Sequence, residues 1–338
     1  MLSLASRAVL IQASSVAIPA YVMQCTHIPN KILEGVDRVN RNFLWGLSKS
    51  AKKIHWVGWQ KVTKPKEERG LGLQSAKGKN TALLAKLNWR LHVEKEALWA
   101  KVLRHKYCNQ RRTNSINVDR LPCSQIWKAV KKGRGTFNEG SMWTIGRDSK
   151  LSFWWDNWTG LGPLHYMIQG PLTRGADQWK VCDIISELRW DWEQIPFDLP
   201  LKVKSIIQAT PIPFASRGQD RLAWSGNPRG TFDLKSAYSF ATADEVVPSF
   251  NAGWIWKLEM LPKIQTFLWM CQHNSIGVKS CLARRGVVVD ESCPICQREL
   301  ESIIHAWVKR VWMQLGVSIG KCICCIDIVV FLTYCRET

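Results

Sequence analysis

The sequence has 338 residues, with 47 Lys and Arg against 27 Asp and Glu, which gives a formal net charge of +20. Its hydrophobic content of 46% is typical of folded proteins and excludes a chain that is disordered throughout. The apolar N-terminal stretch, residues 1–25, is interrupted by Arg7, Gln12 and Pro19, so it is too short and too broken to span a bilayer. We therefore expect no membrane partner, and the alternative interpretation of this stretch is a secretory or organellar leader.

The positive charge is concentrated in one part of the chain. Residues 1–134 contain 26 Lys and Arg against 7 Asp and Glu, whereas residues 135–338 contain 21 against 20. Such an excess disfavours compaction and is best explained by a polyanionic partner. Tryptophans such as Trp45, Trp89 and Trp99 are spread through the basic part, which indicates a folded surface and not a tail. The predicted partner is RNA, DNA or an RNA–DNA hybrid.

The first two predicted elements are helices. Ser3 can cap a helix that runs to about residue 17, and Pro19 ends it. The buried side of this helix is expected to contain Leu4, Val9 and Leu10. Pro29 opens a second helix, in which apolar residues recur at three- and four-residue steps. Its buried side is expected to contain Ile32, Leu33, Val36, Val39 and Phe43.

The most basic stretch follows, at residues 49–79, and aromatic side chains interleave with its cations. This mixture is typical of surfaces that track a nucleic-acid strand, where cations meet phosphates and rings stack on bases. The alternative is a solvated basic loop over a Trp-containing core. The candidate nucleic-acid-binding residues are Lys49, Lys52, Lys53, His55, Trp56, Trp59, Lys61, Lys64, Lys66, Arg69, Lys77 and Lys79.

The rest of the chain predicts a helix-dominated α+β fold. Residues 81–107 have helical periodicity, with Leu84, Leu87, Leu91, Leu98 and Val102 on the expected core side. The charge-balanced, Trp-rich middle predicts short strands at 142–145 and 151–155 and a turn, strand and helix within 224–240. Most tryptophans there are expected in the core. Pro262 precedes an apolar helix, and short helices flank a Cys-x-x-Cys turn.

That turn is the sharpest local motif. Cys293 and Cys296 can hold one Zn²⁺ from a tight turn, and His305 supplies a third ligand. Structural zinc requires four ligands, and no cysteine follows His305 within the next five residues, which end at Arg310. Zinc binding is therefore expected to be weak or lost unless another residue substitutes. The candidates are His273, Cys322, Cys324 and Cys325. The alternative is a pair of inert thiols beside a surface histidine.

Catalytic motifs are otherwise absent from the sequence. It contains no Gly-rich phosphate loop, no Gly-x-Ser-x-Gly elbow and no adjacent aspartates of the kind that hold metal for nucleotidyl transfer. The scattered cysteines do not resemble a secreted disulfide framework. They favour a reducing compartment, nuclear or cytoplasmic.

In their order along the chain, several segments resemble the C-terminal part of a plant-type LINE (non-LTR) retrotransposon reverse transcriptase. Their order is more specific than any single segment. The segments are 2–7 (LSLASR), 18–24 (IPAYVMQ), 43–46 (FLWG), 55–59 (HWVGW), Pro65-Lys66, 70–72 (GLG), 99–107 (WAKVLRHKY), 153–158 (FWWDNW), 230–238 (GTFDLKSAY), Trp256-Lys257, 267–269 (FLW) and Cys293–His305.

The resemblance implies a domain organisation. Residues 1–112 would be a basic, helical, thumb-like region, 113–245 a Trp-rich connector, 250–315 a reverse-transcriptase zinc-binding domain, and 316–338 an atypical Cys-rich tail. The catalytic palm of the family would lie upstream. Relatives carry a fourth cysteine after the histidine, and a deletion of about five residues here would explain its loss.

The predicted function is that of a non-catalytic remnant of a retrotransposon reverse transcriptase that binds nucleic acid without sequence specificity. Two alternatives remain. One is a structural or protein-interaction protein repurposed by a host, and the other is a reverse-transcriptase part that is active only with a palm domain supplied in trans. The sequence gives no indication of oligomeric state.

Overall fold

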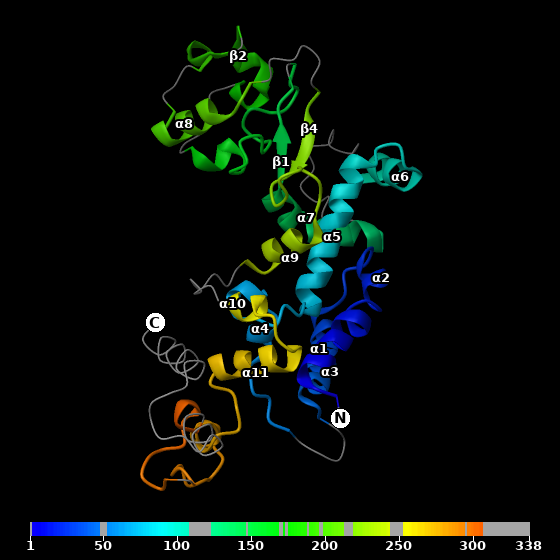
Figure 1. Ribbon diagram of the computed structural model, residues 1–338. Helices are drawn as coiled ribbons and strands as arrows, with labels where there is room; N and C mark the ends of the chain where they lie inside the picture. The colour runs from blue at the N-terminus through cyan, green and yellow to red at the C-terminus, as the bar shows by residue number, and fades with distance from the viewer. Residues whose placement is uncertain are drawn as a thin grey trace. The chain divides into compact units, whose positions relative to one another are not determined.

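The structure is a computed structural model that confirms the helix-dominated α+β class (Figure 1). It describes residues 2–47, 53–107, 123–146, 148–168, 172, 175–187, 189–195, 199–212, 219–243, 253–294 and 296–306. Among these residues, no helix combines the length and the apolar character needed to cross a membrane.

The chain divides into two compact units, and both are discontinuous in sequence. The first unit contains the described parts of Met1–Val16, Gly35–Gln74 and Val247–Thr338. The second contains Ala17–Glu34 and the described parts of Ser75–Val246. The basic residues 53–72 and the Cys-x-x-Cys turn thus belong to one compact body, although more than 200 residues separate Gly72 from Cys293 in the sequence. The domain boundaries expected from the sequence stay a prediction.

The first unit is built from short helices. They are α1 (Leu4–Leu10), a π-helical turn (Ile11–Ser15), the Gly35–Trp45 part of α3 (Asn30–Trp45), α4 (Trp59–Val62), a 3₁₀ turn (Lys66–Glu68), α10 (Trp254–Lys257), α11 (Pro262–Gln272) and α12 (Lys279–Ala283). Ser3 caps α1 as predicted, because its Oγ accepts a hydrogen bond from the Ser6 amide. Pro262 opens α11, where the missing amide costs no hydrogen bond.

The buried sides of α1 and α3 differ from the prediction. Val9 is 62% exposed and Leu10 is 41% exposed, and Ile11 is the buried residue at this end of the helix. Along α3 the side chains of Ile32, Val39 and Phe43 are exposed. Leu33 is buried as predicted, and the other buried positions are Asn40, Leu44 and Trp45. Asn40 explains the error: its amide oxygen accepts a hydrogen bond from Ser15 Oγ, so a polar residue occupies a core position that an apolar pattern rejects.

The second unit contains longer helices and short antiparallel strands. Its helices are α2 (Ala20–Met23), α5 (Ala76–Val93), α6 (Leu98–Tyr107), α7 (Gln125–Gly140), α8 (Leu201–Ala209) and α9 (Leu234–Ala241). Strand β1 (Ser141–Thr144) pairs with β4 (Arg221–Trp224), and β2 (Ile185–Ser186) pairs with β3 (Arg189–Trp190). Further 3₁₀ turns lie at Leu164–Met167, Ala176–Gln178, Val181–Ile184 and Trp192–Gln194.

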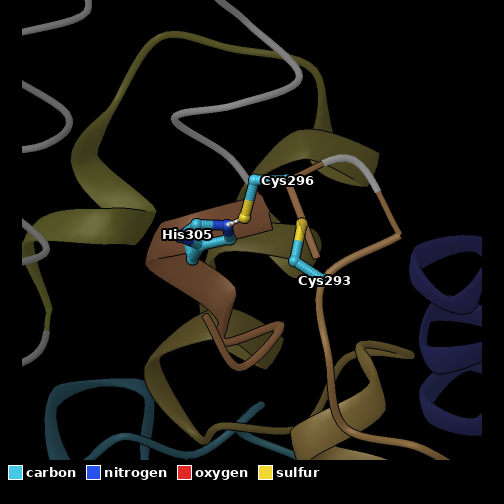
Figure 2. Close-up of side chains that lie close together, drawn as sticks. All are labelled: Cys293, Cys296 and His305. Carbon is cyan, nitrogen blue, oxygen red and sulfur yellow. Dashed lines mark hydrogen bonds between the residues drawn. The ribbon is translucent and has the colours of Figure 1, made fainter. Parts of the chain in front are cut away.

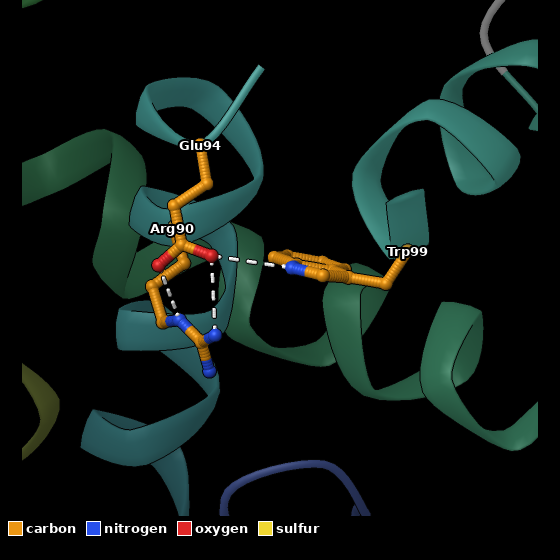
Figure 3. A network of polar contacts seen from close by, with 3 residues as sticks. All are labelled: Arg90, Glu94 and Trp99. Carbon is orange, nitrogen blue, oxygen red and sulfur yellow. Dashed lines mark hydrogen bonds and ion pairs between the residues drawn. The ribbon is translucent and has the colours of Figure 1, made fainter. Parts of the chain in front are cut away.

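The helical stretch predicted at 81–107 is two helices with a break between them. Glu94 ends α5, and its carboxylate accepts hydrogen bonds from Arg90 Nε (2.7 Å) and Trp99 Nε1 (3.2 Å) at the corner (Figure 3). Leu84, Leu87 and Leu91 are buried as expected. The break turns α6 away from that register, so Leu98 and Val102 are exposed, contrary to the prediction.

The described part of the Trp-rich middle buries several aromatic side chains and partly buries most of the others. Phe153, Trp154 and Trp158 lie in one apolar core of the second unit, which confirms the expected core role of these tryptophans. The predicted strand at 142–145 is β1, but residues 151–155 form turns around this core and not a strand. Likewise, the strand predicted after the turn at 227–230 precedes it, as β4.

Candidate nucleic-acid interface and metal centre

The candidate interface is built on a compact loop. We call residues 53–72 the basic segment. Its loop is closed by backbone bonds from the Leu71 amide to the Val62 carbonyl (3.1 Å) and from the Gly72 amide to the Lys64 carbonyl (3.0 Å). Inside it, the Gly70 amide donates to the Pro65 carbonyl (2.9 Å). These bonds give the cations of the loop a defined backbone, as opposed to a flexible tail.

The cations of the basic segment are displayed to different degrees. Lys53, Lys61 and Lys66 are exposed, whereas Lys64 and Arg69 are half-buried. Across the described ranges, Lys53, Lys61, Lys64 and Lys66 form no ion pair with a carboxylate. No carboxylate within those ranges therefore neutralises the positive charge of these four lysines through an ion pair. Lys49 and Lys52 lie outside the described residues.

The aromatic residues of the segment contact protein. Trp56 and Trp59 are half-buried and pack against an apolar core of the first unit that contains Leu44, Trp45 and Val57. The Arg285 guanidinium also lies over the Trp56 ring, 5.2 Å from its centroid. Base stacking by Trp56 or Trp59 stays a prediction.

Burial and nearby cations lower the pKa values of two histidines, His55 and His273. Burial lowers the pKa of His55, and the nearby Arg41 lowers it further. Burial also lowers the pKa of His273; its hydrogen bond to the Arg69 carbonyl opposes this shift, and the charges of Lys61 and Arg69 reinforce it. Both imidazoles are therefore neutral near pH 7, and positive potential surrounds them.

The remaining candidates, Lys77 and Lys79, lie on α5 in the second unit. Lys77 is exposed. Burial lowers the pKa of Lys79, and the charge of Lys86 lowers it further. The twelve candidate cations and aromatics thus do not form one surface within the first unit.

The candidate metal centre is held by a small hairpin-like turn. Ser292 and Leu300 form an antiparallel bridge, and the Cys293 amide donates to the Glu299 carbonyl (2.8 Å). The Cys293 carbonyl accepts from the Gln297 amide (2.8 Å), and Gln297 adopts a left-handed conformation with φ of 51°. This geometry brings both thiols of the Cys-x-x-Cys motif to one side of the turn.

The three predicted ligands converge (Figure 2). The Sγ atoms of Cys293 and Cys296 and a ring nitrogen of His305 all lie within 4.8 Å of one another. Cys296 Sγ is 3.2 Å from His305 Nε2. Bond lengths of about 2.3 Å for Zn–S and 2.0 Å for Zn–N place ligand atoms on a tetrahedral zinc ion about 3.5 to 3.8 Å apart. The three donors can therefore close on one Zn²⁺ through side-chain shifts of about 1 Å.

The electrostatics of the turn also suit a metal. Backbone amides of Arg298 and Glu299 stabilise the thiolate and lower the pKa of Cys296 from 9.0 to about 7. The thiolate is the form that binds zinc. By contrast, burial raises the pKa of Cys271 to about 12, and the neighbouring Cys281 adds to that shift, so Cys271 stays protonated as a core residue.

Glu299 is a site residue that the sequence analysis missed. Its carboxylate oxygen Oε2 lies 2.8 Å from His305 Nδ1. This contact places the proton of neutral His305 on Nδ1 and leaves Nε2 free to bind the metal, which is the usual outer-shell arrangement around zinc. An acid between the second cysteine and the histidine is the only signal for it in the sequence.

No fourth ligand joins the cluster within the described part of the chain. His273, one proposed substitute, instead directs its Nε2 toward the Arg69 carbonyl at 2.8 Å. Cys322, Cys324 and Cys325 lie outside the described residues. The described centre is therefore a three-ligand Cys₂His set.

Comparisons with known proteins agree with this geometry. Residues 232–314 match the family described as zinc-binding in reverse transcriptase. The metal-ligand cluster lies within the matched range, so the comparison supports zinc as the metal that the turn can hold.

Two relatives from Arabidopsis thaliana extend the match. The "Putative ribonuclease H protein" is 31% identical over 322 residues, which cover 94% of this chain and 52% of that protein. An uncharacterized mitochondrial protein is 31% identical over 154 residues, which cover 44% of this chain and 99% of that protein. The chain thus spans about half the length of the first relative. No solved structure matches it.

Proposed function

We propose a function from one premise: the chain belongs to the plant non-LTR retrotransposon reverse-transcriptase family and corresponds to its C-terminal region. The proposed function is that of a non-catalytic remnant that binds nucleic acid without sequence specificity. Its own residues supply phosphate-binding cations and a metal-holding turn. Its sequence has no paired aspartates for nucleotidyl transfer. The ribonuclease H designation belongs to the relative that carries it.

One observation carries the proposal. The basic segment presents Lys53, Lys61 and Lys66 to solvent, and none of them is paired with a carboxylate in the described regions of the chain. Unpaired cations on an ordered loop attract phosphates and release the counterions condensed on a nucleic acid. Contacts to phosphates position a strand but do not read its bases, so the expected binding is independent of sequence.

Zinc would serve this function structurally. When the ion is bound, two thiolates and one imidazole would hold it and thereby fix the turn. The ion would cross-link these side chains and would take part in no reaction on a substrate. With one ligand fewer than a closed structural site, the expected affinity is low.

The test is the salt dependence of binding by the full chain. Fluorescence anisotropy with a labelled RNA–DNA hybrid should give an affinity that falls steeply and linearly on a log–log plot against salt concentration. Reversal of three cations (Lys53→Glu, Lys61→Glu and Lys66→Glu) should reduce the magnitude of that slope by about 2 to 3.

A matched control reverses three exposed lysines of the charge-balanced part, Lys150→Glu, Lys202→Glu and Lys235→Glu. It changes the net charge by the same amount, so it separates a local interface from general charge. Equal losses in the two triple variants, or affinity that does not respond to salt, would refute the proposal. Primer extension by the purified chain would overturn its non-catalytic part.

A further inference from the structure

The backbone of the basic segment is held by side chains from the far end of the sequence. We call residues 253–306 the C-terminal module. From its helix α11, Trp269 Nε1 donates to the Arg69 carbonyl at 2.8 Å, and His273 Nε2 lies 2.8 Å from the same oxygen. A carbonyl can only accept, so the His273 proton resides on Nε2. Both lone pairs of one loop carbonyl are thus occupied by the module.

The carbonyl that receives these bonds sits at a conformationally unusual residue. Arg69 has a φ of 63°, in the left-handed region that non-glycine residues seldom adopt. Such a conformation persists only where neighbouring contacts favour it. The two donors from α11 provide those contacts, and they fix the turn between Lys66 and Gly70.

A second attachment lies at the start of the segment. The Arg285 guanidinium donates to the carbonyls of His55, at 2.7 Å, and of Trp56. The same guanidinium lies over the Trp56 ring. Two nitrogen donors and the face of one planar guanidinium thereby hold two consecutive peptide groups and a ring.

Apolar packing joins the same two parts of the chain. Trp269 is fully buried in one core with Val57, Val62 and Leu71 of the basic segment and with Leu73, which directly follows it. The Lys66 ammonium lies 4.7 Å from the centroid of the Trp256 ring, on α10 of the module. The module therefore supports the segment along most of its length.

We propose that Trp269, His273 and Arg285 are positioning residues of the nucleic-acid-binding surface: the C-terminal module acts on RNA or DNA by fixing the backbone that displays the cations. This inference rests on the proposed function. A loop ordered before binding loses less conformational freedom when phosphates dock, so it binds more tightly than the same cations on a loose loop. Trp269 and His273 carry no charge here and need not touch the ligand.

A charge-neutral variant tests this. Trp269→Phe keeps the buried ring and removes the N–H donor to Arg69. The matched control is Trp158→Phe in the second unit, where an equally buried indole donates to the Phe153 carbonyl at 2.9 Å. The readouts on the full chain are amide hydrogen exchange of peptides within 53–72 and anisotropy with the labelled RNA–DNA hybrid.

Trp269→Phe should speed exchange within 53–72 and weaken binding by about fivefold to tenfold, the effect of one lost hydrogen bond on an equilibrium. Trp158→Phe should leave both within about twofold of wild type, since its bond is local to another core. If Trp269→Phe lowers the thermal midpoint further than the control does, His273→Leu gives the second measurement and His273→Gln, which restores a donor, should recover binding.

Two outcomes would overturn the inference. One is unchanged exchange in 53–72 for both Trp269→Phe and His273→Leu. The other is faster exchange without weaker binding. A wild-type chain that binds no hybrid at all would instead refute the proposed function itself, and the inference with it, whatever the exchange data show.

Discussion

Trp158 and Trp269 are both buried tryptophans that donate a hydrogen bond, yet the bond of Trp158 is local and the bond of Trp269 is long-range. Each is almost completely buried, and each donates its indole N–H to a backbone carbonyl, at 2.9 and 2.8 Å. The acceptor of Trp158 is Phe153, five residues away, whereas the acceptor of Trp269 is Arg69, 200 residues away. The first bond shapes a local turn, and the second joins two distant parts of one unit.

This difference shows how a binding surface can depend on a residue that is far from it in the sequence. A local bond can be lost with an effect confined to its own turn. A long-range bond closes a long loop of chain, so its loss releases conformational entropy in both segments that it joins. The expected effects of substitutions therefore decrease from long-range contacts to local ones.

Asn80 should show the largest effect, because its buried side chain makes three long-range bonds within the second unit. Its buried amide donates to the carbonyls of Met23 and Thr26 and accepts from the Ile28 amide. Asn80→Ala leaves buried backbone groups unpaired and should lower the free energy of unfolding by about 3 kcal/mol. Asn138→Ala, at an exposed position of α7, should change it by less than about 0.5 kcal/mol. Urea denaturation measures both, and similar values for the two would contradict the contrast.

Gly70 should come second, because it sets the shape of the basic segment. A Cβ at this position would lie 1.8 Å from the Lys64 carbonyl oxygen, so Gly70→Ala must displace the loop backbone. The expected destabilisation is about 2 kcal/mol. Gly58→Ala is the matched control, since a Cβ there meets nothing within 4 Å. Equal thermal midpoints for the two variants would show that the loop is not held as described.

Glu299 should have an effect that is confined to the metal. Glu299→Ala removes the carboxylate that orients His305 and should weaken Zn²⁺ binding about tenfold to 100-fold, or about 1.4 to 2.7 kcal/mol. Competition with a chromophoric zinc chelator measures the affinity. Glu259→Ala, an exposed acid outside the turn, should leave it unchanged. Unaltered zinc affinity in Glu299→Ala would remove Glu299 from the site.

The contrast between local and long-range contacts also explains what the sequence could predict. Ser3 at the start of α1, Pro262 at the start of α11 and the Cys-x-x-Cys turn were predictable, because each depends on neighbours within a few residues. The three metal ligands span only Cys293–His305, and they converge as the spacing indicates.

Features that depend on distant partners were not predictable. Periodicity shows that α3 has apolar stripes but not which stripe is covered, and the Ser15–Asn40 hydrogen bond selected the side that contains a polar residue. In the same way, no local pattern pairs Trp269 with Arg69. Glu299 was missed because an exposed acid is ordinary until its distance to His305 is known.

The most local contact should have the smallest effect, and pH reveals it. At the corner between α5 and α6, the hydrogen bond from Arg90 lowers the pKa of Glu94 below its ordinary value of 4.5, and Trp99 adds to the shift (Figure 3). A carboxylate with a depressed pKa stabilises the fold above its unfolded-state pKa and loses that contribution as pH falls through the folded-state value.

Above pH 4.5, Glu94→Gln should therefore lower the thermal midpoint slightly, by the equivalent of roughly 0.5 kcal/mol for a solvent-exposed pair four residues apart. This deficit should shrink as the pH falls further below that ordinary value. Glu96→Gln is the control: its side chain is 90% exposed and pairs with Lys101, so its deficit should be smaller. A deficit for Glu94→Gln that grows on acidification would mean that the protonated carboxyl, and not the carboxylate, stabilises the corner.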